Sequence, residues 1–230
     1  MSGEKGWTFA VKGSEELVLR GQKSTALYTA TVHRTTGESW ALHSAGTTYS
    51  KGVGRPEEIF VVDGTGYVKE GGPEAAWKHG PLTDPEIADK VEDPVAALNA
   101  FQEYATEETT DSAISLIKSG DQVELQVRTS SAALSGVRER AVVKKAVREL
   151  KPTLKQLRAA GVTASESQIT VENVVESVVL DASTYRINAH IFRCAFLIPY
   201  DGRSIRYSQG VTESNQGTFA GTIALPAGAK

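Results

Sequence analysis

Hydrophobic and polar residues alternate with a period of two through the first third of the chain. Every second side chain is hydrophobic from Trp7 to Val11, and a similar alternation runs from Thr25 to Arg34. Because successive side chains of a strand point to opposite faces, this period predicts strands with one buried and one wet face. Asp63-Gly64 lies between two such runs and is the strongest hairpin signal in the chain. Gly13-Ser14 is expected to form another turn.

The middle of the chain changes to a helical period. Asp93-Pro94 supplies an N-cap followed by proline at the first helical position, and hydrophobic residues then recur at three-to-four spacing to about Glu107. A longer helix with the same spacing ends at Gly161, and Pro152 inside it is expected to kink or split it. Between the two helices, the pattern predicts a pair of strands that begins at Ala113.

The last third of the chain reads as long strands again. Short turns join them, so successive strands are expected to be antiparallel. In the second strand the hydrophobic phase changes at Ile191-Phe192, which predicts a bulge there or burial on both faces. The whole chain is therefore expected to be an α+β fold, a curved antiparallel sheet with helices on one face, in a single domain over residues 1–230. The expected strands are 168–180, 185–200, 203–213 and a short final one from Thr218 to Leu225.

Composition narrows the class of protein. Lys and Arg number 25 and Asp and Glu 28, and the net charge of −3 argues against a general nucleic-acid binder. The single cysteine, Cys194, excludes an internal disulfide and a cysteine-rich zinc site, and its apolar strand predicts a buried thiol. The longest strictly apolar run, Cys194–Ile198, is far shorter than the ~20 residues that span a bilayer. The first residues show no signal core, which fits either a cytoplasmic protein or a chain given without its export segment.

Charge is distributed unevenly along the chain. Residues 81–111 are strongly acidic, whereas residues 137–160 are strongly basic. The simpler interpretation is two solvated helix faces. The sharper one is that the basic helix contacts anionic lipid headgroups or a protein partner. The residues that would form this surface are Arg140, Lys144, Lys145, Arg148, Lys151 and Lys155.

Motifs for catalysis or metal binding are not recognisable. Ser115 and Lys118 match Ser-x-x-Lys, but a strand would separate the two side chains. We therefore expect no metal, no cofactor and no enzymatic activity. A hydrolase stays the third alternative, and it would need a histidine beside a carboxylate or a hydroxyl. The four histidines follow no metal-ligand spacing; they are His33, His43, His79 and His190.

Three short motifs follow one another in a characteristic order. The first is the hairpin Ile59–Val68 with Trp77-Lys78 after it, the second is the helix start at Asp93-Pro94, and the third is Val178–Tyr185. Their order and spacing resemble the LolA/LolB-like bacterial lipoprotein superfamily, which includes mycobacterial lipid-carrying lipoproteins and related uncharacterised Gram-positive lipoproteins. The resemblance implies an unclosed half-barrel with helices covering its concave face. It also implies an extracytoplasmic, lipid-anchored protein of the cell envelope, whose signal peptide and lipobox are not in this chain.

The leading hypothesis for function joins this resemblance to the apolar pattern. The protein is expected to bind or carry a lipid or other hydrophobic small molecule, without catalysis, in a cavity between sheet and helices. The alternative is an envelope sensor or protein-interaction domain with a packed core and no lipid cargo. Open sheet edges would also allow a homodimer. The residues expected to line the cavity, each of which could instead be plain core, are Trp40, Phe60, Leu98, Phe101, Tyr104, Val147, Leu154, Phe192 and Phe196.

Overall fold

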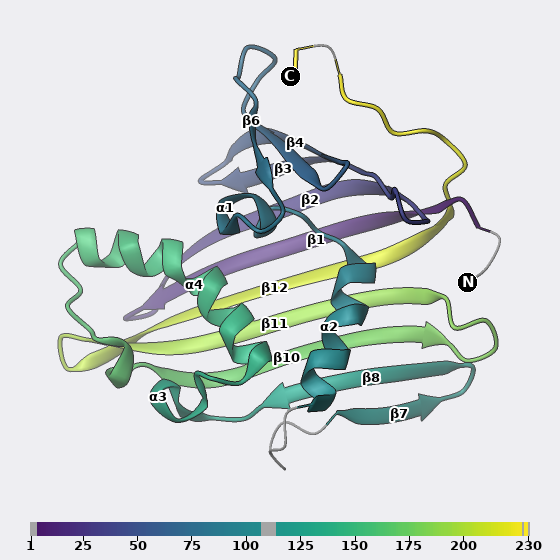
Figure 1. Ribbon diagram of the computed structural model, residues 1–230. Helices are drawn as coiled ribbons and strands as arrows, with labels where there is room; N and C mark the ends of the chain where they lie inside the picture. The colour runs from purple at the N-terminus through teal and green to yellow at the C-terminus, as the bar shows by residue number, and fades with distance from the viewer. Residues whose placement is uncertain (1–3, 107–113, 227, 230) are drawn as a thin grey trace. The chain divides into compact units, whose positions relative to one another are not determined.

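The computed structural model describes residues 4–106, 114–226 and 228–229 (Figure 1). The strands are β1 (Gly6–Leu19), β2 (Gln22–Thr35), β3 (Leu42–Ser50), β4 (Val53–Val62), β5 (Thr65–Glu70), β6 (Lys78–Pro81), β7 (Ser115–Ser119), β8 (Gln122–Thr129), β9 (Ala132–Ala133), β10 (Thr170–Asp181), β11 (Ile187–Tyr200) and β12 (Arg203–Thr218). The helices are α1 (Pro85–Ala88), α2 (Pro94–Thr106), α3 (Leu134–Val137), α4 (Ala141–Ala159) and a 3₁₀ turn at Glu166–Gln168. The expected helix end at Glu107 and strand start at Ala113 lie outside the described residues.

Antiparallel strands dominate the fold. Their hydrogen-bonded order is β6-β5-β4-β3-β2-β1-β12-β11-β10-β8-β7, and β9 pairs with β10. The two ends of this order are different strands, so the sheet is not closed. An open antiparallel sheet with helices confirms the expected α+β class.

The chain forms two compact units. Unit 1 contains Met1–Gly13, Ala26–Asp93 and Glu213–Lys230, and unit 2 contains Ser14–Thr25 and Pro94–Thr212. Strands β1, β2 and β12 each contribute residues to both units. The expectation of a single domain stays a prediction.

The hairpin of β4 and β5 in unit 1 follows the sequence prediction closely. Asp63 and Gly64 have φ of 50° and 74°, as a tight turn between twisted strands requires. One residue further, Gly66 lies under α1, because a Cβ there would be only 2.3 Å from Cγ2 of Ile87. Ile87 packs on Ile59 and Val68, so the face of β4 and β5 that carries these two residues is the core face of unit 1.

Two expected features of the strands are wrong. Gly13-Ser14 does not turn the chain: β1 continues to Leu19, and the turn falls at Arg20-Gly21, with φ of 53° and 78°. A two-residue hairpin needs both central residues in the left-handed region, and that requirement is met there. The expected final strand over residues 218–225 is also absent from the described residues. Strand β12 ends at Thr218, directly after Gly217 with φ of 119°, and Phe219 then donates a single backbone hydrogen bond to Gly6.

In unit 2, two helices contact the strands. Helix α2 contacts β10 and β11, and α4 contacts β8 and β10 (Figure 1). Of the two outcomes expected at Pro152, a kink or a split, the split is wrong, because α4 is continuous through this residue. Figure 1 shows that α4 is bent along its length. Pro152 is exposed, so the carbonyl that loses its hydrogen-bond donor can turn to water.

The expected bulge at Ile191-Phe192 is displaced. Register shifts occur between Val171 and Asn173 and between Val179 and Leu180, so the extra residue of β11 is Asn188. The alternation of buried residues changes phase at this earlier point, from Ile187 to His190 and Phe192. Further along the strand, three successive residues are buried, Cys194, Ala195 and Phe196, which agrees with the alternative of burial on both faces.

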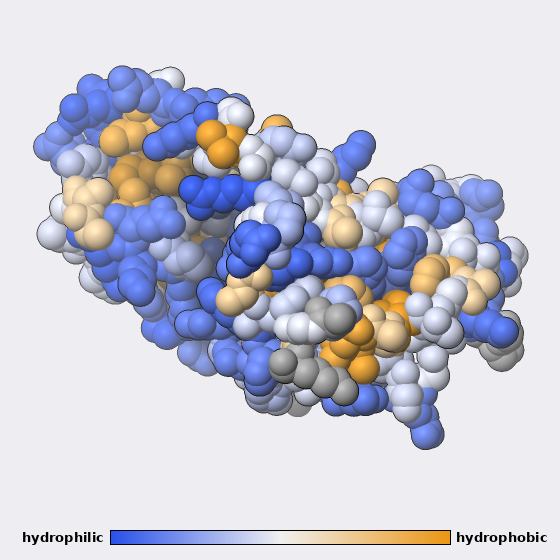
Figure 2. Space-filling view, turned by 90° about the horizontal axis from the view of Figure 1, so that it is seen from above, coloured by the Kyte–Doolittle hydropathy of each residue, from blue (hydrophilic) through white to orange (hydrophobic). Residues whose placement is uncertain are grey.

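Hydrophilic residues cover most of the surface seen in Figure 2, and hydrophobic residues gather there in separate groups. Within the described ranges, the helices fall short of the combination of length and apolar character that a membrane crossing needs.

Candidate functional site

Strands β2 to β5 carry a row of side chains on the face of unit 1 opposite to its core. Thr31, Ala45, Glu58 and Lys69 lie directly across from one another on these four strands. Each is next in sequence to a position of the core face, and successive side chains alternate between faces. This row therefore points away from α1.

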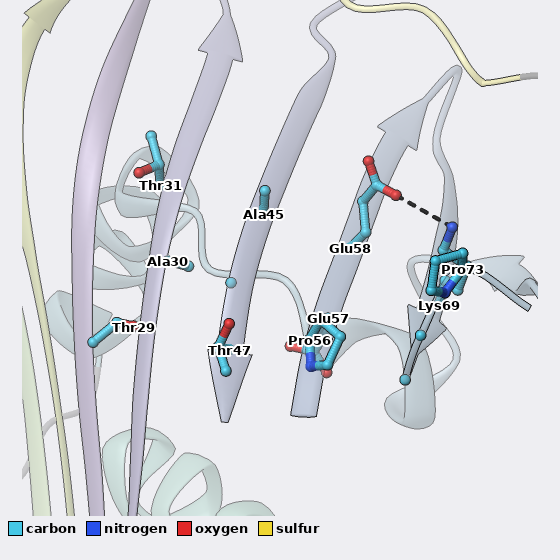
Figure 3. Close-up of a pocket in the computed structure, with 13 residues that line it drawn as sticks. Thr29, Ala30, Thr31, Ala45, Thr47, Pro56, Glu57, Glu58, Lys69 and Pro73 are labelled. Atoms are coloured by element: carbon cyan, nitrogen blue, oxygen red, sulfur yellow. Dashed lines mark ion pairs between the residues drawn. The ribbon is translucent and has the colours of Figure 1, made fainter. Parts of the chain in front are cut away.

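A hollow of about 720 Å³ lies on this outer face (Figure 3). Its volume falls in the range of roughly 300–1,000 Å³ that is typical of small-molecule sites. Small side chains keep the floor low, and the loop after β5 forms one wall. We call it the threonine hollow, and its lining residues are Thr29, Ala30, Thr31, Ala45, Gly46, Thr47, Pro56, Glu57, Glu58, Lys69, Gly71, Gly72 and Pro73.

One end of the threonine hollow is apolar and exposed. Leu27 and Tyr49 lie opposite each other, two positions before Thr29 and two after Thr47, and so share the outer face. Their exposed fractions are 54% and 47%, which is high for large hydrophobic residues. A Cβ on Gly54 would lie 3.0 Å from Cε1 of Tyr49, so this ring lies over the glycine of β4.

The other end is bounded by rings. His43 stacks on Phe60 with 4.3 Å between centroids, and Trp77 meets Phe60 edge-on at 5.7 Å. His33 stacks on Phe219 at 4.7 Å and lies 6.4 Å from His43. Burial lowers the pKa of His33, and the charge of His43 lowers it further. His33 and His43 lie two positions beyond Thr31 and Ala45 on the same face, so these rings mark this end of the hollow without belonging to its lining.

Two charged residues that line the hollow, Lys69 and Glu58, are only loosely paired with each other. The ammonium of Lys69 is 3.6 Å from Oε2 of Glu58, beyond hydrogen-bond distance, and lies 4.9 Å from the ring centroid of Trp77. Oε1 of Glu58 is 3.3 Å from Nε2 of His43. In Figure 3 the side chains of Glu58 and Lys69 point toward one another across the outer face.

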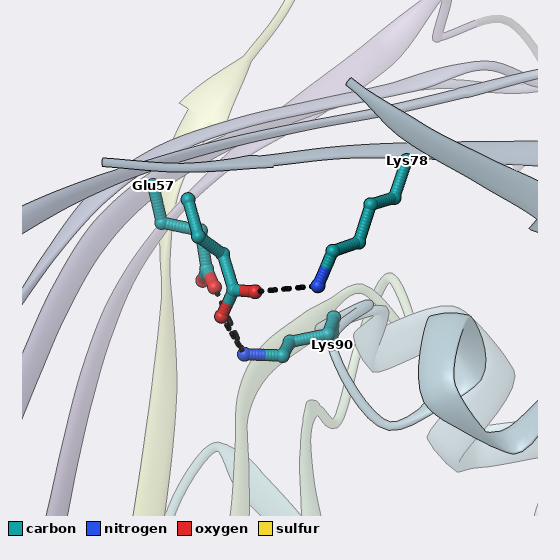
Figure 4. Close-up of polar contacts among 4 residues, drawn as sticks. Glu57, Lys78 and Lys90 are labelled. Atoms are coloured by element: carbon teal, nitrogen blue, oxygen red, sulfur yellow. Dashed lines mark hydrogen bonds and ion pairs between the residues drawn. The ribbon is translucent and has the colours of Figure 1, made fainter. Parts of the chain in front are cut away.

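The opposite face of the same strands pairs its charges tightly. Lys90 donates to Oε1 of Glu70 at 2.6 Å and to Oε2 of Glu57 at 3.2 Å, and Lys78 lies 3.7 Å from Glu70 (Figure 4). Burial alone would lower the pKa of Lys90, but the hydrogen bond to Glu70 and the two carboxylate charges raise it overall. The lysine of this network holds two carboxylates, whereas Lys69 holds none at hydrogen-bond distance.

A second polar site lies in the interior of unit 2. The carboxylate of Glu176, on β10, is fully buried. Its Oε1 accepts from the ammonium of Lys145 at 2.6 Å and is 2.9 Å from Nε2 of His190, and its Oε2 accepts from the hydroxyl of Tyr104. The ammonium of Lys145 also lies 4.7 Å from the centroid of the Phe192 ring. We call Glu176, Tyr104, Lys145 and His190 the Glu176 cluster.

The Glu176 cluster holds its carboxylate ionised. Burial alone would raise the pKa of Glu176, but the hydrogen bond with His190 and the charge of Lys145 outweigh it and lower the pKa to about 2. Burial and the nearby carboxylate raise the pKa of Tyr104, so its hydroxyl stays a donor. The cluster joins α2 and α4 to two strands of the sheet and leaves both oxygens of Glu176 occupied.

The nine residues expected to line a cavity divide between the units. Trp40 and Phe60 belong to unit 1, where Trp40 lies under the guanidinium of Arg34 at 4.4 Å and Phe60 belongs to the ring boundary of the hollow. None of the nine is among the lining residues of the threonine hollow. The other seven belong to unit 2 and are buried except for the half-buried Leu98; they are Leu98, Phe101, Tyr104, Val147, Leu154, Phe192 and Phe196.

The residues of the expected basic surface are not all on the surface. The ammonium of Lys145 is turned inward to Glu176, and Arg140 is half-buried. Lys144 is exposed and pairs with Glu139 at 3.2 Å. Exposed positions of this surface along α4 also include Arg148, Lys151 and Lys155.

Single-residue predictions for chemistry have clear outcomes. Cys194 is buried, and burial raises the pKa of its thiol to about 12, which confirms the prediction of an unreactive strand residue.

In the third motif, Oδ1 of Asp181 accepts from the backbone N–H and the hydroxyl of Thr184, both at 2.7 Å. These hydrogen bonds, with the matching pair from Ser183, hold the pKa of Asp181 well below its usual range. The motif is therefore a self-bonded turn.

Three histidines have the kind of neighbour that the hydrolase alternative requires. The hydroxyl of Thr8 is 3.0 Å from Nδ1 of His33, while His43 and His190 contact Glu58 and Glu176. The requirement of a histidine beside a carboxylate or hydroxyl therefore does not eliminate a hydrolase. In the Thr8–His33 and His43–Glu58 contacts, however, the hydroxyl and the carboxylate meet different imidazoles, whereas a serine-hydrolase relay passes through one.

The sequence prediction named Tyr104 and Lys145 in other roles, but it missed Glu176 and the lining of the threonine hollow. Most residues that line the hollow occupy the polar positions of alternating strands. In the sequence, threonines at such positions look like ordinary solvent-facing residues. Glu176 left a clearer signal, because it is the only charged residue between Val174 and Leu180, in a run rich in β-branched residues.

Comparison with solved structures gives matches over most of the chain. LprF from Mycobacterium bovis matches over 98% of this chain and 91% of its own, with 14% identity and a TM-score of 0.35. Rv2717c from M. tuberculosis matches over 92% of both chains, with 9% identity and a TM-score of 0.26. The ywiB protein from Bacillus subtilis matches over 93% of this chain and 95% of its own, again with 9% identity and a TM-score of 0.26.

All three matches have TM-scores below 0.5. The resemblance to LolA/LolB-like lipoproteins therefore rests on the motifs of the sequence. Identities and TM-scores at this level define neither a shared site nor a shared ligand. No family model and no curated protein sequence matches the chain.

Proposed function

We propose that the protein binds a lipid or another hydrophobic small molecule without catalysis, and that the threonine hollow holds this ligand. The observation that carries the proposal is the hollow itself, a space of about 720 Å³ on the outer face of four paired strands. Threonine methyls, alanine and proline supply apolar contacts along its floor. Such burial stabilises a bound chain by about 0.8 kcal/mol per methylene, so no reaction is needed for retention.

The ends of the hollow support an elongated ligand. The row of Leu27 and Tyr49 is separated from the row of His33 and His43 by six positions along each strand, which corresponds to about 20 Å. An apolar chain along this path would meet exposed hydrophobic side chains at one end and stacked rings at the other. Because the floor belongs to hydrogen-bonded strands, the site is formed before the ligand arrives.

The cavity expected between helices and a concave sheet face is the other candidate location, in unit 2. There the aromatic residues expected to line it are buried among themselves and the strands, and the Glu176 cluster occupies the same interior. The burial of these residues favours, for unit 2, the alternative of a sensor or interaction domain with no cargo. For ligand binding, the threonine hollow is therefore the better candidate.

The setting of this function follows from the resemblance. The proposal includes an extracytoplasmic position at the cell envelope and an N-terminal lipid anchor. It also includes edge-to-edge pairing of two copies, since β7 lies at one end of the strand order and exposes 69% of Leu116 and 42% of Ile117.

Native mass spectrometry of the protein purified from its own host tests the proposal. A co-purifying lipid of defined mass is expected, and Ala45→Phe should displace it by filling the floor of the hollow. Ala45 is exposed, so the larger side chain leaves the core of unit 1 unchanged. Ala159→Phe, the same substitution at the exposed end of α4, is the matched control and should retain the lipid. A lipid that stays bound to Ala45→Phe would contradict the hollow as its site.

A further inference from the structure

We propose that the ligand of the threonine hollow carries an anionic group, such as a carboxylate or phosphate, and that Lys69 binds it. This inference rests on the proposed function and specifies the chemical class of its ligand. The first observation is the loose pairing of Lys69, whose ammonium is 3.6 Å from the nearest oxygen of Glu58. In the same unit Lys90 approaches Glu70 to 2.6 Å, so lysines of this unit do form close pairs where the geometry allows.

The ammonium of Lys69 is held in place although its nearest carboxylate oxygen lies beyond hydrogen-bond distance. Its side chain is 20% exposed, and its ammonium lies 4.9 Å from the ring centroid of Trp77. A cation over an indole face keeps its position while its N–H groups stay available for a stronger acceptor. Lys69 is itself one of the residues that line the hollow.

Two acidic residues near Lys69, Glu57 and Glu58, differ in how firmly other cationic groups hold them. Glu57 bonds Lys90 at 3.2 Å and is thereby neutralised. Glu58 stays within reach of both Lys69 and His43, so it competes with an incoming anion for Lys69. The proposal therefore predicts opposite effects for two neighbouring residues: loss of Lys69 should weaken the binding of an anion, and loss of the Glu58 charge should strengthen it.

Titration with oleate and oleyl alcohol tests the anionic group, because the two probes share the same unsaturated hydrocarbon chain and differ only in the head group. Binding is followed by tryptophan fluorescence, to which Trp77 beside Lys69 contributes. Oleate should bind at least about tenfold more tightly than the alcohol, as one charge-assisted hydrogen bond predicts. Lys69→Met should abolish this preference and leave the affinity for the alcohol unchanged. Glu58→Gln should increase the preference, a change that a merely structural role of Glu58 would not produce.

Lys78→Met is the matched control, because it removes the same charge from a lysine of the same unit that is 75% exposed. It should bind both probes as the parent protein does. Equal affinity for oleate and the alcohol, with binding still sensitive to Ala45→Phe, would overturn the anionic group and leave the proposed function standing.

Two further results separate the proposals from each other. Failure of both probes to bind would overturn the proposed function together with this inference. Inorganic phosphate alone tests a free anion as the source of the charge. If phosphate binds as tightly as oleate and requires Lys69, the anion site is correct and the hydrophobic ligand of the proposed function is wrong.

Discussion

The threonine hollow and the Glu176 cluster differ in how closely their charged side chains are paired. In the cluster, one fully buried carboxylate is contacted by three partners, and its pKa falls to about 2. In the hollow, Lys69 and Glu58 are partly exposed and remain 3.6 Å apart. A buried charge must be satisfied by the fold itself, whereas a partly exposed charge is solvated by water and stays accessible to a ligand. The difference fits a stabilising role for the cluster and the proposed binding role for the hollow.

The largest effect is expected for Glu176→Ala, which leaves the ammonium of Lys145 and the imidazole of His190 in the interior without their carboxylate. Breaking a buried ion pair by removing one partner costs about 3–5 kcal/mol. The free energy of unfolding in urea measures this loss. Glu172→Ala is the control, because Glu172 lies on β10 like Glu176 and also forms an ion pair, with Arg206 of β12 at 2.7 Å. The side chain of Glu172 is 36% exposed, however. Its loss should stay below about 1 kcal/mol, and equal losses for the two variants would refute the assigned role of the cluster.

A smaller effect is expected from acid. The pKa of Glu176 is lowered in the folded protein, from its usual value of 4.5 to about 2. Its contribution to stability is therefore fully present above about pH 4.5 and is lost as the pH falls toward 2. A shift of this size corresponds to on the order of 3 kcal/mol. Urea unfolding followed across this pH range should show the loss for the parent protein.

The Glu176→Gln variant provides the comparison for the acid limb, since its side chain does not titrate. The part of the pH dependence that belongs to Glu176 should disappear in this variant. A parent protein and a Gln variant with the same dependence below pH 4.5 would show that Glu176 is not held ionised by its partners.

Sequence reasoning succeeded where a local rule decides the structure. The turn at Asp63-Gly64 depends on two residues that tolerate positive φ, and the strand period of residues 7–11 depends only on alternation. It failed at Gly13-Ser14, because whether a glycine turns or continues a strand depends on the pairing of its neighbours. The phase of β11 was misplaced by three residues for the same reason, since the extra residue at Asn188 is set by the register with β10.

The sites were harder to predict than the fold. A cavity was expected from large hydrophobic residues, but the hollow is formed by small residues on four strands, which come together only through the register. Lys145 shows the same limit: its spacing along α4 placed it with the surface lysines, and only the position of Glu176 on β10 explains why its ammonium is directed inward. The contact between Lys145 and Glu176 joins residues 31 positions apart, where periodicity carries no information.

The smallest change in stability is expected for Lys69→Met and Glu58→Gln, and it sharpens the comparison most. Both side chains are partly exposed, and their charges are not in hydrogen-bond contact with each other. Each substitution should therefore alter the free energy of unfolding by less than about 1 kcal/mol. The same variants are expected to change the preference for an anionic probe in opposite directions. A small change in stability together with a large change in ligand preference would indicate that Lys69 and Glu58 act in binding rather than in folding. A loss of several kcal/mol in Lys69→Met would instead make the Glu58–Lys69 pair structural, like the Glu176 cluster, and would remove the distinction between the two regions.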